Sequence, residues 1–200
     1  MNYLAHSVLS FGNENILVGN FIADHVRRVE FESIDKEIKK GVTLHRKIDY
    51  FTDTHPMFIK SKRYFYEEFE RYSGVLADIY YDHILATNFA KYSQVKLNDF
   101  AKSVYQVLDK NIQHLPESSR QFLHYVKKHN TFIEYSKLNG IELVLRHLSL
   151  RINHGVDLSK SINYFVANKE KMEEDFFIFM KDVMEFSKKE LAQYQSVSHY

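Results

Sequence analysis

Histidine and aspartate concentrate in the first 83 residues of this 200-residue chain, and the spacing of two of them could support chemistry. His45 and Asp49 are four positions apart on a predicted helix, on the stripe that also carries Ile38 and Val42. An imidazole and a carboxylate on that stripe face the interior, where an unpaired charge is costly. The same spacing also fits an ordinary i,i+4 pair in a salt-bridge network, and the pair alone favours that interpretation.

Other acidic residues lie inside apolar segments. Asp24 follows Phe-Ile-Ala, and Asp82 with His83 lies within Ile-Tyr-Tyr-Asp-His-Ile-Leu. Acidic side chains are almost never fully buried without a partner, and one divalent cation would serve several of them at once. With oxygen and nitrogen donors and no cysteine, Mn²⁺, Mg²⁺ or Fe²⁺ is expected ahead of structural zinc. Spacing and residue type thus predict a His/Asp metal site, with a solvent-exposed helix end as the alternative for Asp24.

The elements that must position these residues are predicted to be helices. Only 6 Gly and 2 Pro are present, too few for the turns of a β-rich fold, and apolar residues recur every three or four positions. Helices are predicted around 34–49, 75–83 and 100–112, in a long or broken C-terminal segment over 158–186, and in shorter segments at 2–11, 15–29, 57–72, 118–129 and 141–153. Ser33 is predicted to cap a helix and Pro56 to begin one, while Gly19 and Gly41 could allow close helix approach. We expect an all-α fold, a single compact helical domain over 1–200.

Composition narrows the classes of function. Lys+Arg 27 against Asp+Glu 26 gives a net charge of +1, without the basic excess typical of a nucleic-acid binder. The absence of cysteine excludes disulfides, thiolate catalysis and zinc-finger modules. No apolar run approaches the roughly 18 residues of a membrane helix, and no secretory signal is visible. We therefore expect a cytoplasmic protein that binds neither nucleic acid nor membrane.

Four segments together resemble the acyl carrier protein phosphodiesterase family. They are MNYLAH at 1–6, GNFIAD at 19–24, HRKIDYFTDTHP at 45–56 and YDHIL at 81–85. Their order and approximate spacing match the family pattern M-N-[FY]-L-A-H, G-N-x-x-x-D, H-R-x-I-D-x-[FY]-T-D-x-H-P and D-H-[FI]-L, and a weaker likeness continues to the end of the chain. One departure is Phe89, which stands where the family has Trp.

The resemblance implies a hydrolase that removes 4′-phosphopantetheine from the serine of holo-acyl carrier protein with the help of a divalent metal, Mn²⁺ or Mg²⁺. It also implies a fold related to the HD phosphohydrolases, with the motif order rearranged. The metal ligands that it implies are Asp24, His45, Asp82 and His83. The catalytic candidates that it implies are His6, Arg46, Asp49 and His55, with Asn20 as a substrate-binding candidate.

General chemistry suggests roles for the residues in this pattern. The guanidinium of Arg46 could neutralise charge on phosphate oxygens, since it binds phosphate in a bidentate way. Asp49 could orient the imidazole of His45 and raise its basicity. His6 or His55 could supply the proton that the leaving serine oxygen needs.

The carrier-protein substrate of this family is acidic, so a basic patch should receive it. Two clusters are candidates for that patch, and a solvated helix face is the alternative interpretation of both: Arg27, Arg28, Lys36, Lys39 and Lys40, or Lys60, Lys62 and Arg63. Two other functions stay open, because fold and site chemistry do not fix the substrate. One is an HD-like hydrolase of a nucleotide or other small phosphodiester, and the other is a non-catalytic helical module that binds a carrier protein.

Overall fold

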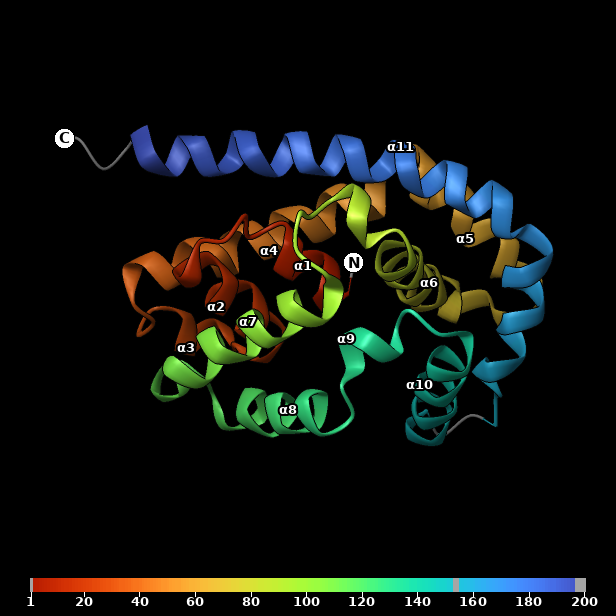
Figure 1. Cartoon of the computed structure of the whole chain (residues 1–200), viewed down its shortest axis with the longest axis horizontal. Helices are drawn as coiled ribbons and strands as arrows, with labels where there is room; N and C mark the ends of the chain where they lie inside the picture. The colour runs from red at the N-terminus through yellow and green to blue at the C-terminus, as the bar shows by residue number, and fades with distance from the viewer. Residues whose placement is uncertain (1, 153–154, 197–200) are drawn as a thin grey trace.

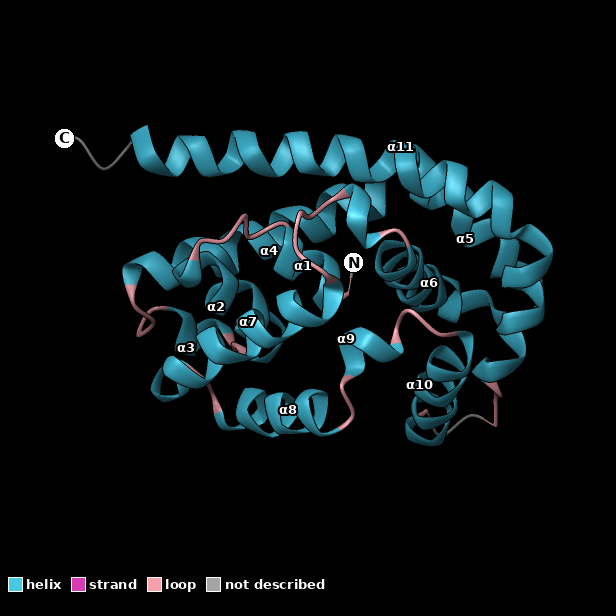
Figure 2. Ribbon diagram, in the orientation of Figure 1, coloured by secondary structure: helices cyan, strands magenta, loops and turns pink. Residues whose placement is uncertain are grey.

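The computed structural model describes residues 2–152 and 155–196, with the side chains of Arg28 and of residues 195–196 left out. Helices are the regular elements throughout these ranges, which contain no strand (Figures 1 and 2). The α-helices are α1 (Tyr3–Val8), α2 (Glu14–Ile22), α3 (Arg28–Phe31), α4 (Lys36–Thr54), α5 (Pro56–Phe69), α6 (Ser73–Thr87), α7 (Leu97–Lys110), α8 (Glu117–Lys128), α9 (Thr131–Glu134), α10 (Leu138–Arg151) and α11 (Ser161–Ser196). The 3₁₀ turns are η1 (Ala23–His25), η2 (Glu70–Tyr72), η3 (Phe89–Lys91), η4 (Ile112–His114) and η5 (Leu158–Lys160). The prediction of an all-α domain is confirmed.

The two ends of α4 illustrate how local sequence sets a helix. Asp35 caps its N-terminus, because the carboxylate accepts hydrogen bonds from the backbone N–H groups of Glu37 at 2.8 Å and Ile38 at 3.4 Å. The predicted cap at Ser33 is therefore wrong by two residues. After α4, Pro56 is the first residue of α5, as predicted, and its position loses no needed N–H.

Two other boundaries differ from the sequence prediction. The segment predicted as one helix over 15–29 ends as an α-helix at Ile22, continues as η1, and turns to extended backbone at Val26. This break brings Asp24 to the end of the helix rather than its interior. The C-terminal segment, predicted as one helix or a broken pair, is the single helix α11, which crosses the top of Figure 1. Within the described ranges, none of the helices combines the length and apolar character of a membrane span.

A close helix crossing joins α2 to α4 through two glycines. A Cβ atom on Gly19 would meet the carbonyl oxygen of Ile38 and lie 2.6 Å from the Cα of Gly41. A Cβ on Gly41 would lie 2.5 Å from the carbonyl oxygen of Ile16. Real Cβ atoms do not approach backbone so closely, and the prediction that these glycines allow close helix approach is confirmed.

Candidate metal centre

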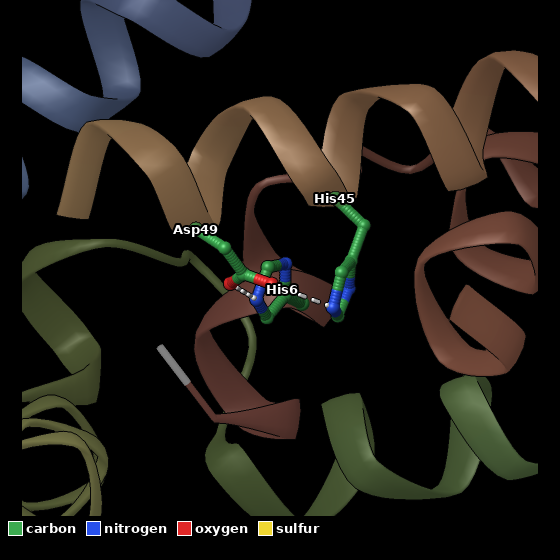
Figure 3. Close-up of side chains that lie close together, drawn as sticks. All are labelled: His6, His45 and Asp49. Carbon is green, nitrogen blue, oxygen red and sulfur yellow. Dashed lines mark hydrogen bonds and ion pairs between the residues drawn. The ribbon is translucent and has the colours of Figure 1, made fainter. Parts of the chain in front are cut away.

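Two helices bring three potential ligands together (Figure 3). His6 comes from α1, while His45 and Asp49 lie one turn apart on α4. The Asp49 carboxylate bridges the two imidazoles, with Oδ1 3.1 Å from His6 Nε2 and Oδ2 3.0 Å from His45 Nε2. The rings stack with centroids 3.9 Å apart, and one ligand atom from each residue lies within 4.8 Å of the others.

Asp24 and Tyr3 extend this cluster toward solvent. Oδ1 of Asp24 lies 3.2 Å from His45 Nε2, and the Tyr3 hydroxyl donates to Oδ2 of Asp24 at 3.1 Å. The side chain of Asp24 is 53% exposed, whereas His6 and His45 are buried. The Asp24 side is therefore the face from which a substrate can approach.

Buried hydrogen bonds hold His6 in place. The Asn20 amide nitrogen donates to the carbonyl oxygen of His6 at 3.2 Å and to Ser10 Oγ at 2.9 Å. Ser10 Oγ in turn donates to the same carbonyl oxygen at 2.9 Å. Asn20, predicted to bind substrate, thus contacts the backbone behind the cluster, and substrate binding by it stays a prediction.

The charges in the cluster follow from these contacts. Burial and the neighbouring His45 lower the pKa of His6 to about 4. Burial also opposes the charged form of His45, but hydrogen bonds with Asp24 and Asp49 outweigh it and raise that pKa to about 9. For Asp49, burial is outweighed by hydrogen bonds with both histidines, which hold the pKa well below its usual range. Near pH 7 the cluster therefore contains one neutral imidazole, one imidazolium and two carboxylates, and its net charge of −1 favours a cation.

The donor set fits a divalent ion with nitrogen and oxygen ligands. The two Nε2 atoms and the Asp49 carboxylate converge from different helices, and Asp24 lies against the same nitrogen of His45. The Nδ1 atoms of His6 and His45 are buried without a hydrogen-bond partner within the described part of the chain. An ion at the Nε2 atoms would replace the proton that His45 now shares with the carboxylates.

Asp82 and His83, also predicted as metal ligands, lie apart from this cluster on α6. The fully buried Asp82 carboxylate accepts from the backbone N–H groups of Leu4 at 3.0 Å and Ala5 at 3.3 Å. It therefore holds the first turn of the helix that carries His6. Nδ1 of His83 donates to the carbonyl oxygen of Tyr135 at 2.7 Å, and burial lowers its pKa. Metal binding by this pair stays a prediction.

Two predicted catalytic residues also lie elsewhere. The guanidinium of Arg46 lies over the ring of Phe31, 5.0 Å from its centroid. His55 sits at the α4–α5 junction, where Nδ1 accepts from Met57 N at 3.2 Å and Nε2 lies 3.2 Å from Asp182 Oδ2. Their catalytic roles stay predictions, and the contacts of His55 are those of a helix cap tied to α11.

The predicted basic patch is only partly described. Arg27 is exposed and pairs with Glu30, with Nε 3.0 Å from Oε1. The side chain of Arg28 lies outside the described residues. Docking of a carrier protein at this patch stays a prediction.

Sequence reasoning missed the role of Tyr3 as a partner of Asp24. Its hydroxyl crosses from α1 to η1, a contact between residues 21 positions apart that no helical spacing indicates. His6 and Asp49 were expected to act beside the metal rather than hold it, yet they form the candidate ligand group with His45. The signal available for them was the motif, which holds both residues at fixed positions.

Comparison with known proteins identifies the family of this chain. The model of the acyl carrier protein phosphodiesterase family matches residues 1–183. The chain belongs to this family. A relative from Pectobacterium atrosepticum named acyl carrier protein phosphodiesterase is 30% identical over 189 residues, covering 94% of this chain and 98% of the relative.

Two further relatives carry the same name. The protein from Yersinia pestis is 27% identical over 185 residues, covering 92% of this chain and 96% of its own. The protein from Escherichia coli O6:H1 is 28% identical over 189 residues, with the same coverage of each chain. No solved structure matches the chain. The predicted family is confirmed, and it is a family of phosphodiesterases. The likeness to HD phosphohydrolases stays a prediction.

Proposed function

We propose that this chain is a metal-dependent phosphodiesterase that hydrolyses the bond between 4′-phosphopantetheine and the serine of holo-acyl carrier protein. The observation that carries the proposal is the convergence of two imidazoles and two carboxylates, in a chain that belongs to this family. His6, His45 and Asp49 would hold the ion, with Asp24 at its solvent side. A bound divalent ion supplies Lewis-acid activation of water and of a phosphoryl oxygen.

The chain's own groups have distinct roles in this reaction. Asp49 fixes both imidazoles through its two oxygens, so their rings keep one orientation. Asp24 is the most exposed of the four groups and is oriented by Tyr3 on one oxygen and His45 on the other. In the proposed reaction it would accept a proton from the attacking water and pass it to the departing serine oxygen.

The atoms balance without any other reactant. Water contributes its oxygen to phosphorus while the bond between phosphorus and the serine oxygen breaks. The proton from water ends on that oxygen, giving apo-carrier protein and free 4′-phosphopantetheine.

Mass spectrometry of the carrier protein tests the proposal directly. Purified enzyme is incubated with holo-acyl carrier protein in Mn²⁺ or in EDTA, and the expected result is metal-dependent loss of the phosphopantetheine mass. His6→Gln should abolish that loss, whereas His124→Gln, a matched change at an exposed position on α8, should retain it. Intact holo-carrier protein after incubation with folded, metal-loaded enzyme would contradict the proposal. Turnover of small phosphodiesters in that sample would then favour the small-substrate alternative.

A further inference from the structure

A cavity of about 560 Å³ lies beside the candidate metal centre. It is lined by residues of α1, η1, α6, α8 and α10 and of the α9 region; in Figure 1, α8, α9 and α10 lie below α1 and α6. This volume falls within the range of pockets that hold small organic ligands. None of the groups proposed to hold the metal lines it, so its wall is formed by a different set of side chains.

Tyr3 connects this cavity to the metal centre. Its ring forms part of the cavity wall and packs on Phe122, with centroids 4.3 Å apart, while its hydroxyl reaches Asp24. His25, the residue after Asp24, also lines the cavity, and its Nε2 is buried without a hydrogen-bond partner in the described ranges. A ligand whose phosphate end lies at Asp24 can therefore extend past Tyr3 into the cavity.

The lining suits an elongated ligand with alternating polar and aliphatic parts. Apolar side chains such as Ile79, Val144 and Leu148 form much of the wall. Between them lie polar groups, including the Asp78 carboxylate, the Arg151 guanidinium and the Tyr125 hydroxyl, which is 3.2 Å from Nδ1 of His147, and amides can pair with each kind of group. The pantetheine arm has this composition, since two amides and a hydroxyl alternate with methyl and methylene groups along an uncharged chain.

We infer that this cavity binds the pantetheine arm, with its phosphate end at Tyr3 and Asp24 and its thiol end toward α10. The inference rests on the proposed function, because it takes the arm of holo-acyl carrier protein as the group that must lie next to the scissile bond. The cavity then explains how one site can position a long flexible substituent. Ordering the arm in a preformed cavity lowers the entropic cost of aligning the phosphodiester.

Tryptophan fluorescence gives a binding test that needs no turnover. The chain contains no Trp, so Phe122→Trp places the one tryptophan of the variant in the cavity wall, and excitation at the red edge of the absorption band selects it over tyrosine. We expect pantetheine, which lacks the phosphate, to change its emission saturably. The matched control is Tyr66→Trp on α5, where the native side chain is 64% exposed and does not line the cavity. No response at Phe122→Trp, an equal response at both positions, or a response to inorganic phosphate but not to pantetheine would overturn the inference.

A second test compares two substrates in variants of α8. Gln121 lines the cavity and is exposed, whereas His124 is exposed on the same helix and does not line it. For Gln121→Trp, the ratio of activity on holo-acyl carrier protein to activity on bis(p-nitrophenyl) phosphate should fall at least ~10-fold, a change expected from blocking one pocket. For His124→Trp the ratio should stay within ~2-fold of wild type, as for a surface change. An unchanged ratio in Gln121→Trp would overturn the inference.

These tests separate the inference from the proposed function. Wild-type enzyme that leaves holo-acyl carrier protein intact overturns the proposed function. In that case the fluorescence titration still tests whether the cavity binds pantetheine, because it measures binding in the absence of any reaction.

Discussion

The cluster around Asp49 and the network around Asp175 both place a carboxylate between two helices, but their partners differ. Asp175, buried on α11, accepts from the Lys60 ammonium at 2.7 Å, Ser61 Oγ at 3.3 Å and the Tyr64 hydroxyl at 3.4 Å, all from α5. Two imidazoles are among the partners of Asp49. Lysine and hydroxyl groups remain protonated donors at neutral pH, whereas an imidazole can exchange its proton for a metal ion.

This difference in partners distinguishes a carboxylate that stabilises the fold from one that we propose as a metal ligand. The donors around Asp175 satisfy it permanently and join α11 to α5. In the proposed metal site, a cation would replace the proton that His45 shares with Asp49. The identity of the partners, rather than the burial of the acid, therefore distinguishes the network that we propose to bind a metal from the one that joins two helices.

Asp49→Asn should give the largest effect on function. The amide loses the charge that attracts the ion and can no longer accept hydrogen bonds from both imidazoles. Activity on holo-acyl carrier protein in Mn²⁺ should fall at least ~100-fold, together with Mn²⁺ affinity measured by calorimetry. Asp99→Asn, an exposed change on α7, is the control, and undiminished Mn²⁺ affinity in Asp49→Asn would contradict the assigned ligands.

Asp175→Asn should show the opposite pattern. Losing the carboxylate leaves buried hydroxyl donors poorly paired, so the free energy of unfolding should fall by about 1–3 kcal/mol. Mn²⁺ affinity should match wild type. Glu174→Gln, the exposed neighbour on α11, controls for the loss of one charge, and chemical denaturation measures both variants. A loss of Mn²⁺ affinity without a loss of stability would remove the distinction between the two networks.

The stability of metal-free protein should depend on pH through His45. Its folded-state pKa is raised to about 9 from 6.5, by hydrogen bonds with Asp24 and Asp49 that outweigh burial. The folded state therefore keeps a proton that the unfolded chain releases, so this stabilisation is complete below pH 6.5 and is lost as the pH rises through 9. In EDTA, the Tm difference between wild type and His45→Gln should shrink over that range. A difference that grows with pH would show that the imidazole is neutral.

Tyr3→Phe should give the smallest effect. It removes the hydrogen bond to Asp24 but keeps the ring that lines the cavity. One such bond contributes about 0.5–1.5 kcal/mol, so kcat/KM for holo-acyl carrier protein should fall by ~2–10-fold. Tyr66→Phe, at an exposed position, should leave kcat/KM unchanged. Equal kcat/KM values for the two variants would show that the Tyr3 hydroxyl does not support Asp24.

The all-α fold class and the pairing of His45 with Asp49 could be predicted from the sequence, because both depend on the spacing of residues along a helix. The bond from His6 to Asp49 could not, since it spans 43 positions and depends on how α1 packs against α4. The cap of α4 shows a finer limit. Ser33 and Asp35 are both favourable cap residues, and only the path of the chain decides which one meets the free N–H groups.

Asp82 shows why a sound rule can indicate the wrong partner. The rule that a buried carboxylate needs a partner holds, but the backbone N–H groups at the start of α1 meet that need. A helix N-terminus is a good partner for an acidic side chain, because its first N–H groups have no intrahelical acceptor. The sequence contains no local sign that residues 4 and 5 will lie beside residue 82.

The contact between Gly19 and Gly41 also limits how the sequence around the site can change. Where a large side chain fills a helix crossing, a larger residue on one helix can be compensated by a smaller residue on the other. Here both partners are already the smallest residue, and the atoms that a new Cβ would meet belong to backbone. A substitution at either glycine therefore has no suppressor within the pair, because the new Cβ would push α2 away from α4, the helix that carries His45 and Asp49.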